Sequence, residues 1–396
     1  MPENALHDRV SEHTAHFMKL CPIKNPSRVL AALLLLALFC LPAHATTKND
    51  SLSVKIGQML MIGFRGLSLA EAPQIADDIR DCHIGGVVLF DYDVPSRTPS
   101  RNISSPEQLA SLTGELQKIT TIPLLIAIDQ EGGKVNRLKP ARGFPPSLSA
   151  AHLGELNNPD STRAAALQCA RTLKAMHINL NLAPVADLNV NPDNPVIGKL
   201  GRSFSADPVV VISNITLTCT TYRDEGIIAT LKHFPGHGSS ATDTHRDFTD
   251  ITGSWTEHEL EPYQALIVAG YHDPIMTAHV FNGKLDPLYP ATLSKAILDG
   301  VLRGKLGFKG VIVSDDMQMK AIADHYGLET AIRLAIEAGV DILLFGNNTS
   351  YDAEIASKAT AIIRSLLQKK IITEARIDRS YRRIMELKQR YHIDRT

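Results

Sequence analysis

One stretch of the chain concentrates side chains that can transfer protons. The segment KHFPGHGSSATDTHRDF, residues 232–248, holds three histidines and two aspartates among prolines, glycines and small hydroxyl residues. Asp243 and His245 are two positions apart, so in an extended loop both side chains face the same side. The carboxylate could then accept one imidazole N–H and leave the other ring nitrogen to exchange a proton with a substrate. We therefore predict an acid/base dyad, and a solvated loop histidine is the alternative.

A histidine pair in the same segment raises the alternative of a metal site. His233 and His237 are four residues apart, the spacing at which two histidines on one helix can bind zinc. Pro235 and Gly236 lie between them and oppose such a helix. We therefore expect neither a metal nor a cofactor.

Short apolar runs rich in β-branched residues recur along the chain, separated by segments of helical length. Runs without polar alternation are typical of strands buried on both faces, as in parallel sheets covered by helices. Segments 161–176 and 328–339 have the amphipathic spacing of such helices, and one or two closing helices should follow Gly346. No G-x-G-x-x-G turn follows a run, which disfavours a dinucleotide-binding sheet. The pattern predicts an α/β protein with a single (β/α)8 TIM-type barrel. The predicted strands are Ile56–Phe64, Gly85–Phe90, Pro123–Asp129, Ile178–Leu188, Gly226–Phe234, Pro274–Val280, Gly310–Asp316 and Val340–Gly346.

Titratable side chains follow several of these runs, at the point where each run ends. The C-terminal ends of barrel strands converge on one face, where barrel enzymes keep their active sites, so we expect these side chains to meet there. Helix capping is the alternative for Asp187 and Asp316. The residues concerned are Asp129, Asp187, Lys232, His233, His279, Asp315 and Asp316.

The N-terminal residues have the pattern of a secretory signal peptide. Arg28 precedes the apolar run Val29–Cys40, and a small-residue A-x-A sequence follows. The run is shorter than the roughly 20 residues of a membrane span. We predict a signal peptide over residues 1–45 and a catalytic domain over residues 46–396, exported to the periplasm or the extracellular space. Met18 is an alternative start, and an uncleaved membrane anchor is an alternative to cleavage.

Composition limits the remaining classes of function. The chain has 41 basic and 42 acidic residues, a balance that disfavours an electrostatic role on nucleic acid or an anionic membrane. Cys82, Cys169 and Cys219, the cysteines outside the predicted signal, are too few for a disulfide framework. We expect three buried thiols, with one disulfide and one free thiol as the alternative, and a monomer.

Five motifs occur in order: AIDQEGGKVNR (127–137), IGKLGRSF (197–204), KHFPGHGSSATDTH (232–245), MTAHV (276–280) and VSDDMQM (313–319). Together they resemble glycoside hydrolase family 3, and within it the β-N-acetylglucosaminidase (β-hexosaminidase) branch. The resemblance extends from about Ser51 to the end of the chain. It implies a (β/α)8 barrel, in agreement with the number of apolar runs.

The resemblance also implies roles for single residues. Asp315 matches the nucleophile, which forms a covalent glycosyl-enzyme, although periodicity alone leaves Asp315 and Asp316 open. His245 matches the acid/base residue of this branch and Asp243 its partner. The substrate-binding positions of the family match Asp129, Arg137, Arg202, Lys232 and His233.

The activity implied is that of a retaining exo-β-N-acetylglucosaminidase acting on peptidoglycan fragments or chitin-type oligosaccharides. In many family members a second domain supplies a carboxylate as the acid/base group. Here the loop is expected to supply the acid/base group instead, through His245. Three alternatives stay open: a phosphorylase of the same branch, a β-glucosidase that shares the nucleophile but not the dyad, and a non-catalytic cell-wall-binding protein.

Overall fold

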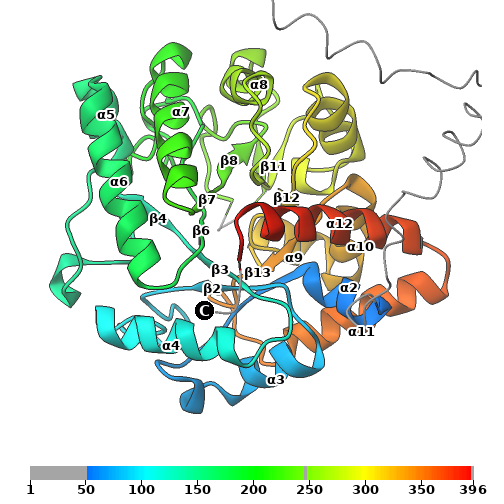
Figure 1. Ribbon diagram of the computed structural model, residues 1–396. Helices are drawn as coiled ribbons and strands as arrows, with labels where there is room; N and C mark the ends of the chain where they lie inside the picture. Colours follow the sequence, from blue (N-terminus) through cyan, green and yellow to red (C-terminus); the bar gives the residue numbers. More distant parts are fainter. Residues whose placement is uncertain (1–50, 245–247, 394–396) are drawn as a thin grey trace, which may run out of the picture. The chain divides into compact units, whose positions relative to one another are not determined.

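The computed structural model describes residues 51–244 and 248–393, and a ring of parallel strands lies at its centre (Figure 1). Every pair of neighbouring strands in the ring is parallel. Each of the eight predicted apolar runs supplies one of the eight strand positions in the ring, which confirms the predicted (β/α)8 barrel. The strands are β1 (Leu60–Gly63), β2 (Gly86–Leu89), β3 (Leu125–Ile128), β6 (Leu180–Asn181), β7 with β8 (Ile228–Ala229 and Leu231–Phe234), β10 (Ile275–Thr277), β12 (Ile312–Val313) and β13 (Leu343–Phe345).

Two sheets meet at their edges to close the ring. A six-stranded sheet has the order β13-β1-β2-β3-β6-β7, and a three-stranded sheet has the order β12-β10-β8. Val185, beyond β6, pairs with Lys232 of β8, and Val313 of β12 pairs with Ile342 just before β13. The strands therefore follow one another around the ring in chain order.

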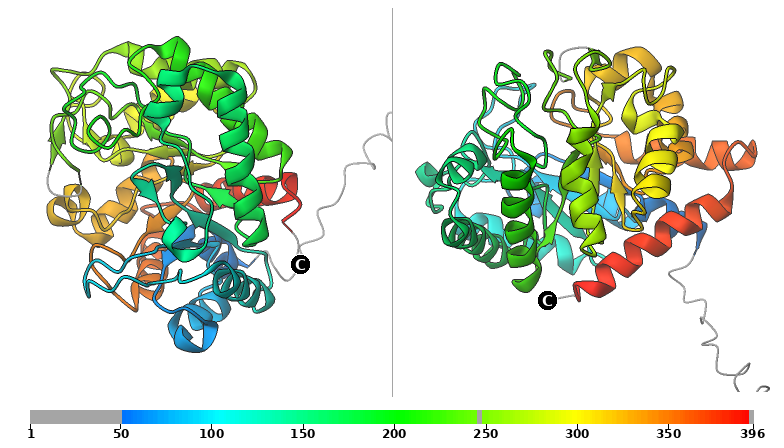
Figure 2. Two further views of the ribbon diagram at one scale, coloured as in Figure 1. Left: turned by 90° about the vertical axis from the view of Figure 1, so that its left-hand side faces the viewer. Right: turned by 90° about the horizontal axis from the view of Figure 1, so that it is seen from above.

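Helices surround the strand ring, as two further views show (Figure 2). Their starts follow the usual capping chemistry: the Asn158 side chain accepts the N–H groups of Asp160 and Ser161, and Pro159 occupies the first turn of α6. The predicted helices at 161–176 and 328–339 correspond to α6 and α10. From Pro73 onward the α-helices are α3 (Pro73–Asp81), α4 (Pro106–Lys118), α5 (Ala150–Leu156), α6 (Pro159–Ala175), α7 (Pro208–Asp224), α8 (Glu261–Val268), α9 (Lys320–Tyr326), α10 (Leu328–Ala338), α11 (Ile355–Gln368) and α12 (Glu374–Arg390), and a π-helix spans Ala296–Lys305.

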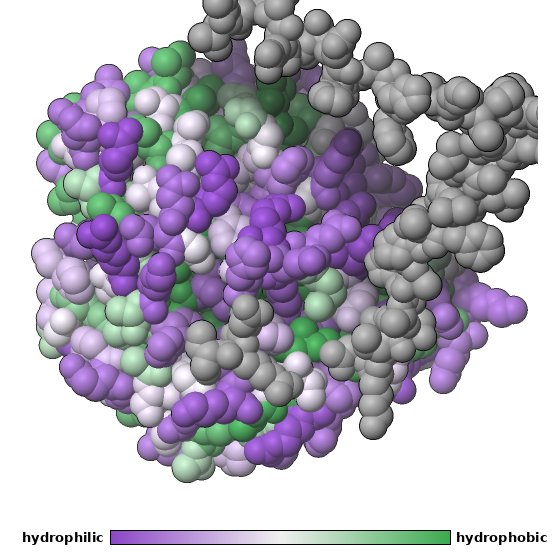
Figure 3. All heavy atoms as spheres, in the orientation of Figure 1, coloured by the Kyte–Doolittle hydropathy of each residue, from purple (hydrophilic) through white to green (hydrophobic). Residues whose placement is uncertain are grey.

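The core lies in and around the strands, where β1, β2 and β3 are buried along their whole length. Strands enclosed on both faces have no solvent side, which explains their uninterrupted apolar sequence. The face shown in Figure 3 is mainly hydrophilic, with apolar residues in scattered patches. Single apolar residues on a surface are ordinary.

Helix α12 lies across the N-terminal ends of several strands. The Lys388 ammonium, which is buried, donates to Gln58 Oε1 at 2.7 Å and to the Gly85 carbonyl at 3.0 Å, just before β1 and β2. Arg376 donates to the Val340 carbonyl at 2.6 Å, ahead of β13. Of the one or two closing helices predicted after Gly346, the structure has two, α11 and α12. Because α12 covers this end, the opposite, C-terminal ends of the strands remain for a site.

The first predicted strand is wrong over its first half. Residues Leu52–Gln58 form helix α2, capped by the Ser51 side chain, and β1 begins only at Leu60. The run IGQMLMIGF is apolar throughout, so its periodicity could not separate a buried helix end from a buried strand.

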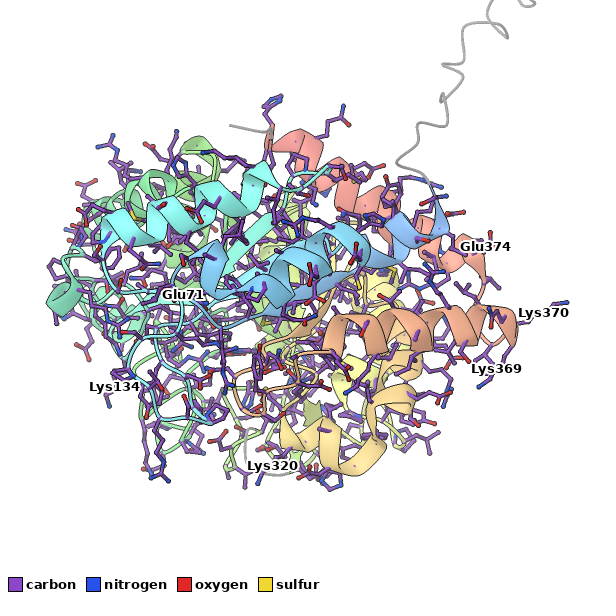
Figure 4. The ribbon with its side chains drawn as sticks, turned by 90° about the horizontal axis from the view of Figure 1, so that it is seen from below. Glu71, Lys134, Lys320, Lys369, Lys370 and Glu374 are labelled. Atoms are coloured by element: carbon purple, nitrogen blue, oxygen red, sulfur yellow. The ribbon has the colours of Figure 1, made fainter. Side chains whose placement is uncertain are left out.

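The three cysteines in the described residues are free, which excludes the single disulfide between them. Cys219 is buried as expected, whereas Cys82 and Cys169 are only half-buried. No helix in the described ranges is long and apolar enough to span a membrane. The predicted signal peptide, residues 1–45, lies outside those ranges. Figure 4 shows Lys369, Lys370 and Glu374 pointing outward where α11 connects to α12.

Candidate active site

A cavity of about 390 Å³ lies at the C-terminal ends of the strands. Its volume is within the roughly 300–1,000 Å³ usual for small-molecule sites. Seven of the eight predicted site residues line it, and the eighth, His245, lies outside the described residues. The seven are Asp129, Arg137, Arg202, Lys232, His233, Asp243 and Asp315.

A buried ion-pair network forms one wall of the cavity. Asp129 directly follows β3, and its Oδ1 lies 2.7 Å from the Lys232 ammonium on β8. The same ammonium lies 2.6 Å from Glu131 Oε1. Burial alone would raise the pKa of Glu131, but Arg202 and Lys232 outweigh burial and lower this pKa to about 2. Both carboxylates are therefore ionised at neutral pH and fix the Lys232 side chain.

Glu131 was not predicted as a site residue, although it lies inside the AIDQEGGKVNR motif. It follows β3 in a short hairpin, β4 (Gln130–Gly132) with β5 (Val135–Asn136). One feature of the sequence could have pointed to Glu131: it comes two residues after Asp129, so in an extended segment both side chains face the same side. Its exposed side-chain fraction of 5% shows that it supports other residues rather than meeting solvent.

Arg202 lies in the wall of the cavity. Its guanidinium donates two hydrogen bonds of 2.8 Å to Glu131, a bidentate geometry that fixes its plane. A third contact of 3.3 Å joins Arg202 Nη2 to His233 Nε2. Because arginine only donates, His233 Nε2 accepts, and the ring proton must be on Nδ1.

Asp187 holds His233 and the loop that follows it. Its Oδ2 lies 2.7 Å from His233 Nδ1, and its Oδ1 accepts the backbone N–H groups of His233 and His237 at 3.2 and 2.8 Å. The side chain is fully buried. The helix-capping alternative for Asp187 is therefore wrong: its carboxylate binds the fifth-strand segment and its loop.

Asp315 and Asp316, two and three residues beyond β12, both line the cavity but differ in their surroundings. Asp315 Oδ1 accepts the backbone N–H of Asp316 at 2.8 Å. Asp316 Oδ1 accepts the backbone N–H groups of Gln318 and Gly346, at 3.0 and 2.9 Å. The Asp316 carboxylate thus joins the chain after β12 to the chain after β13.

The loop after β8 brings Asp243 and Thr244 to the cavity. Its turn is built around His237, whose side chain is buried: Nδ1 lies 2.8 Å from Ser240 Oγ, and Nε2 lies 3.3 Å from Thr244 Oγ1. Burial and the neighbouring His233 lower the pKa of His237 to about 4, so its ring is neutral near pH 7. The sequence analysis weighed His237 only as a metal ligand. In the structure its ring is buried and contacts two residues of its own loop.

Arg137 connects the cavity to the chain after β2. Its guanidinium lies 3.4 Å from Asp129 Oδ2 and 3.8 Å from Asp91 Oδ1, and it stacks over the Phe90 ring at 5.5 Å from the centroid. Asp91 was not predicted. It also pairs with Lys139, so a second buried carboxylate helps to orient the cationic side of the cavity.

His279 does not line the cavity. Its ring is buried, with Nδ1 2.8 Å from Thr292 Oγ1 and Nε2 2.9 Å from the carbonyl of Asp316. It therefore supports the backbone beside Asp315. Within the described ranges, no group of three or more His, Cys, Asp or Glu side chains is arranged to hold a metal ion.

A closed ring of eight parallel strands with charged side chains around a cavity at their C-terminal ends is the architecture of a barrel enzyme. Residues 51–387 match the family model "Glycosyl hydrolase family 3 N terminal domain". The chain therefore belongs to glycosyl hydrolase family 3, as its motifs indicated.

Relatives and solved structures agree with this membership. The chain is 38% identical over 293 residues to a beta-hexosaminidase of Tolumonas auensis, covering 73% of this chain and 83% of that protein. A β-N-acetylglucosaminidase structure from a Paenibacillus strain is similar with a TM-score of 0.79 at 37% identity, covering 87% of this chain and 63% of that one. A β-N-acetylhexosaminidase structure from Beutenbergia cavernae has a TM-score of 0.76 at 31% identity, covering 86% and 98%. The chain thus spans less than two thirds of the Paenibacillus protein.

Proposed function

We propose that the protein is a retaining exo-β-N-acetylglucosaminidase that removes terminal β-linked GlcNAc from peptidoglycan fragments or chitin-type oligosaccharides. The main support is that Asp315 and the Asp243 loop line one cavity together with the Asp129–Lys232–Arg202 wall. The names of the relatives, beta-hexosaminidase and β-N-acetylglucosaminidase, support the sugar.

In this proposal Asp315 attacks the anomeric carbon and forms a glycosyl-enzyme. His245 protonates the departing oxygen, and Asp243 orients its ring and stabilises the charged imidazolium. Water, deprotonated by the same histidine, then releases the sugar. Asp129 would accept from sugar hydroxyls, while Lys232, Arg137 and Arg202 would donate to the remaining hydroxyls and the N-acetyl carbonyl.

The test is hydrolysis of a matched pair of nitrophenyl glycosides, β-GlcNAc and β-glucoside, with the anomer of the first product read by NMR. The proposal expects cleavage of the first substrate and an initial β-anomer. Preference for the glucoside would favour a β-glucosidase, and a glycosyl phosphate formed only when phosphate is added would favour a phosphorylase. Binding of oligosaccharide without turnover would favour a wall-binding protein.

We further propose that the protein is exported. The support is the basic and apolar pattern before Ala45, which no described residue tests. An exported enzyme would meet wall or chitin fragments outside the cytoplasm.

A further inference from the structure

A buried carboxylate outside the cavity holds the turn of the proposed acid/base loop. Glu259 lies in the short helix η4 (Glu257–Leu260), ahead of α8, and is 1% exposed. Its Oε2 accepts the backbone N–H of Gly238 at 3.1 Å and, more weakly, that of Ser239 at 3.4 Å. Glu259 is not among the residues that line the cavity. Its hydrogen bonds therefore act on the loop and not on a ligand.

The loop backbone packs directly against this side chain. Gly236 has φ +122°, and a Cβ built there would lie 2.6 Å from the Cβ of Glu259 and 2.7 Å from its Oε2. Next to it, the Trp255 indole N–H donates to the Pro235 carbonyl at 3.1 Å. Only glycine fits both the conformation and the space at 236. The glycine at position 236 therefore allows the turn to pack in close contact with η4.

Two carboxylates together bind the backbone of this turn. Asp187 accepts the N–H groups of His233 and His237, and Glu259 accepts the next two along the chain, from Gly238 and Ser239. Among the described residues, the other carboxyl oxygen of Glu259, Oε1, is buried without a hydrogen-bond partner. The two loop N–H groups at Oε2 are therefore the hydrogen bonds that offset the burial of this side chain.

A chain of contacts leads from the turn to the cavity. His237 reaches across the loop to Thr244, at 3.3 Å between Nε2 and Oγ1. Thr244 is the neighbour of Asp243, and both line the cavity. A displacement of the turn would therefore displace the carboxylate of the proposed dyad.

We infer that Glu259 is a positioning residue: it holds the 236–240 turn and thereby sets the place of Asp243, the proposed partner of the proton donor, at the cavity. The inference rests on the proposed function for the role of the dyad. It predicts a selective loss, since only substrates that need a proton on the departing oxygen depend on the dyad's position.

The test compares Glu259→Ala with wild type on two substrates, a dinitrophenyl β-GlcNAc glycoside and the GlcNAc disaccharide of chitin. The expected loss in kcat is about 10²-fold on the disaccharide and less than about tenfold on the activated glycoside. Glu259→Gln, which can still accept the two N–H groups, should lose less than Glu259→Ala. Glu257→Gln is the control, because Glu257 is exposed on the same short helix and pairs with Lys305.

Hydrogen exchange measured by mass spectrometry gives a readout that does not depend on activity. Glu259→Ala should speed amide exchange in a peptide that covers 236–244 while leaving that of α6 unchanged. Equal losses on the two substrates, or unchanged exchange in the loop, would overturn the inference. If Glu259→Ala does not fold, Glu259→Asp, one methylene shorter, should show the same selective loss. A wild-type enzyme inactive on both glycosides would refute the proposed function, and the exchange experiment would still test the loop contact.

Discussion

Arg202 and Glu131 form a bidentate salt bridge in the wall of the cavity, with both N···O distances at 2.8 Å. Their side chains are 9% and 5% exposed, so solvent screens the pair little. Glu131 also holds Lys232, which makes one carboxylate the common partner of two cations that face the cavity. A substrate would meet these cations already oriented.

Removing Glu131 should therefore affect both stability and binding. Glu131→Ala leaves Arg202 and Lys232 buried with less compensation, and we expect a loss of about 3–5 kcal/mol in the free energy of unfolding. KM for the β-GlcNAc glycoside should rise because the two cations lose their orientation. Urea denaturation and steady-state kinetics measure the two effects. Glu155→Gln, an exposed change on α5, is the control, and an unchanged KM in Glu131→Ala would contradict this role.

Asp315 and Asp316 should separate activity from stability. Asp315→Ala should abolish turnover with the unfolding midpoint kept, because this carboxylate is the proposed nucleophile. Asp316→Ala should lower the midpoint, since the N–H groups of Gln318 and Gly346 lose their acceptor. A fluorosugar inactivator should label Asp315, as peptide mass spectrometry can check. A label on Asp316, or an Asp315→Ala enzyme with a tenth of wild-type activity, would contradict the assignment.

Asp243 and His245 should act as one unit. Each single alanine variant should slow hydrolysis by about 10²–10⁴-fold on substrates with poor leaving groups. The double variant should cost much less than the product of the two losses, since the second change removes a group that has already lost its partner. Rates on a series of aryl glycosides measure this. Equal losses of His245→Ala across the series would indicate a binding residue instead of a proton donor.

Stability should depend on pH through Glu259. Burial, followed by the nearby Asp187, raises the pKa of Glu259 from 4.5 to about 7, so between these values the folded state holds more protons than the unfolded state. The free energy of unfolding contributed by this group therefore falls as pH rises through that window, by an amount on the order of 3 kcal/mol at most. Glu259→Gln does not titrate, so its stability relative to wild type should increase between about pH 5 and about pH 8. Denaturation curves at both pH values test this, and a constant difference would contradict it.

The exported form of the protein should begin at Thr46. The A-x-A sequence that ends at Ala45 predicts cleavage there. N-terminal sequencing of protein recovered outside the cytoplasm measures the end directly. A sequence that starts upstream of Val29 would instead indicate an uncleaved anchor.

The barrel could be predicted from the sequence because a strand buried on both faces leaves a continuous apolar run, as in GGVVLF and VDILLFG. Asp129, Lys232 and Asp315 could be placed for the same reason, since each comes at or just after the end of such a run. The roles of Glu131 and Glu259 could not be predicted, because they depend on partners about 70 and 20 residues away in the chain. For Asp187 the sequence left a helix cap open as the alternative, and only its contact with the distant His233 decides against the cap.

Trp255 is the only tryptophan in the sequence, and it is buried next to the turn that precedes the proposed dyad in the chain. Its indole N–H is hydrogen-bonded to the Pro235 carbonyl, so a movement of the turn changes the polarity around this one ring. Tryptophan emission from the unlabelled protein therefore reports on one place in the molecule. Stopped-flow fluorescence with a slow substrate or an inactivator could show whether the turn moves during a catalytic cycle, with no dye attached.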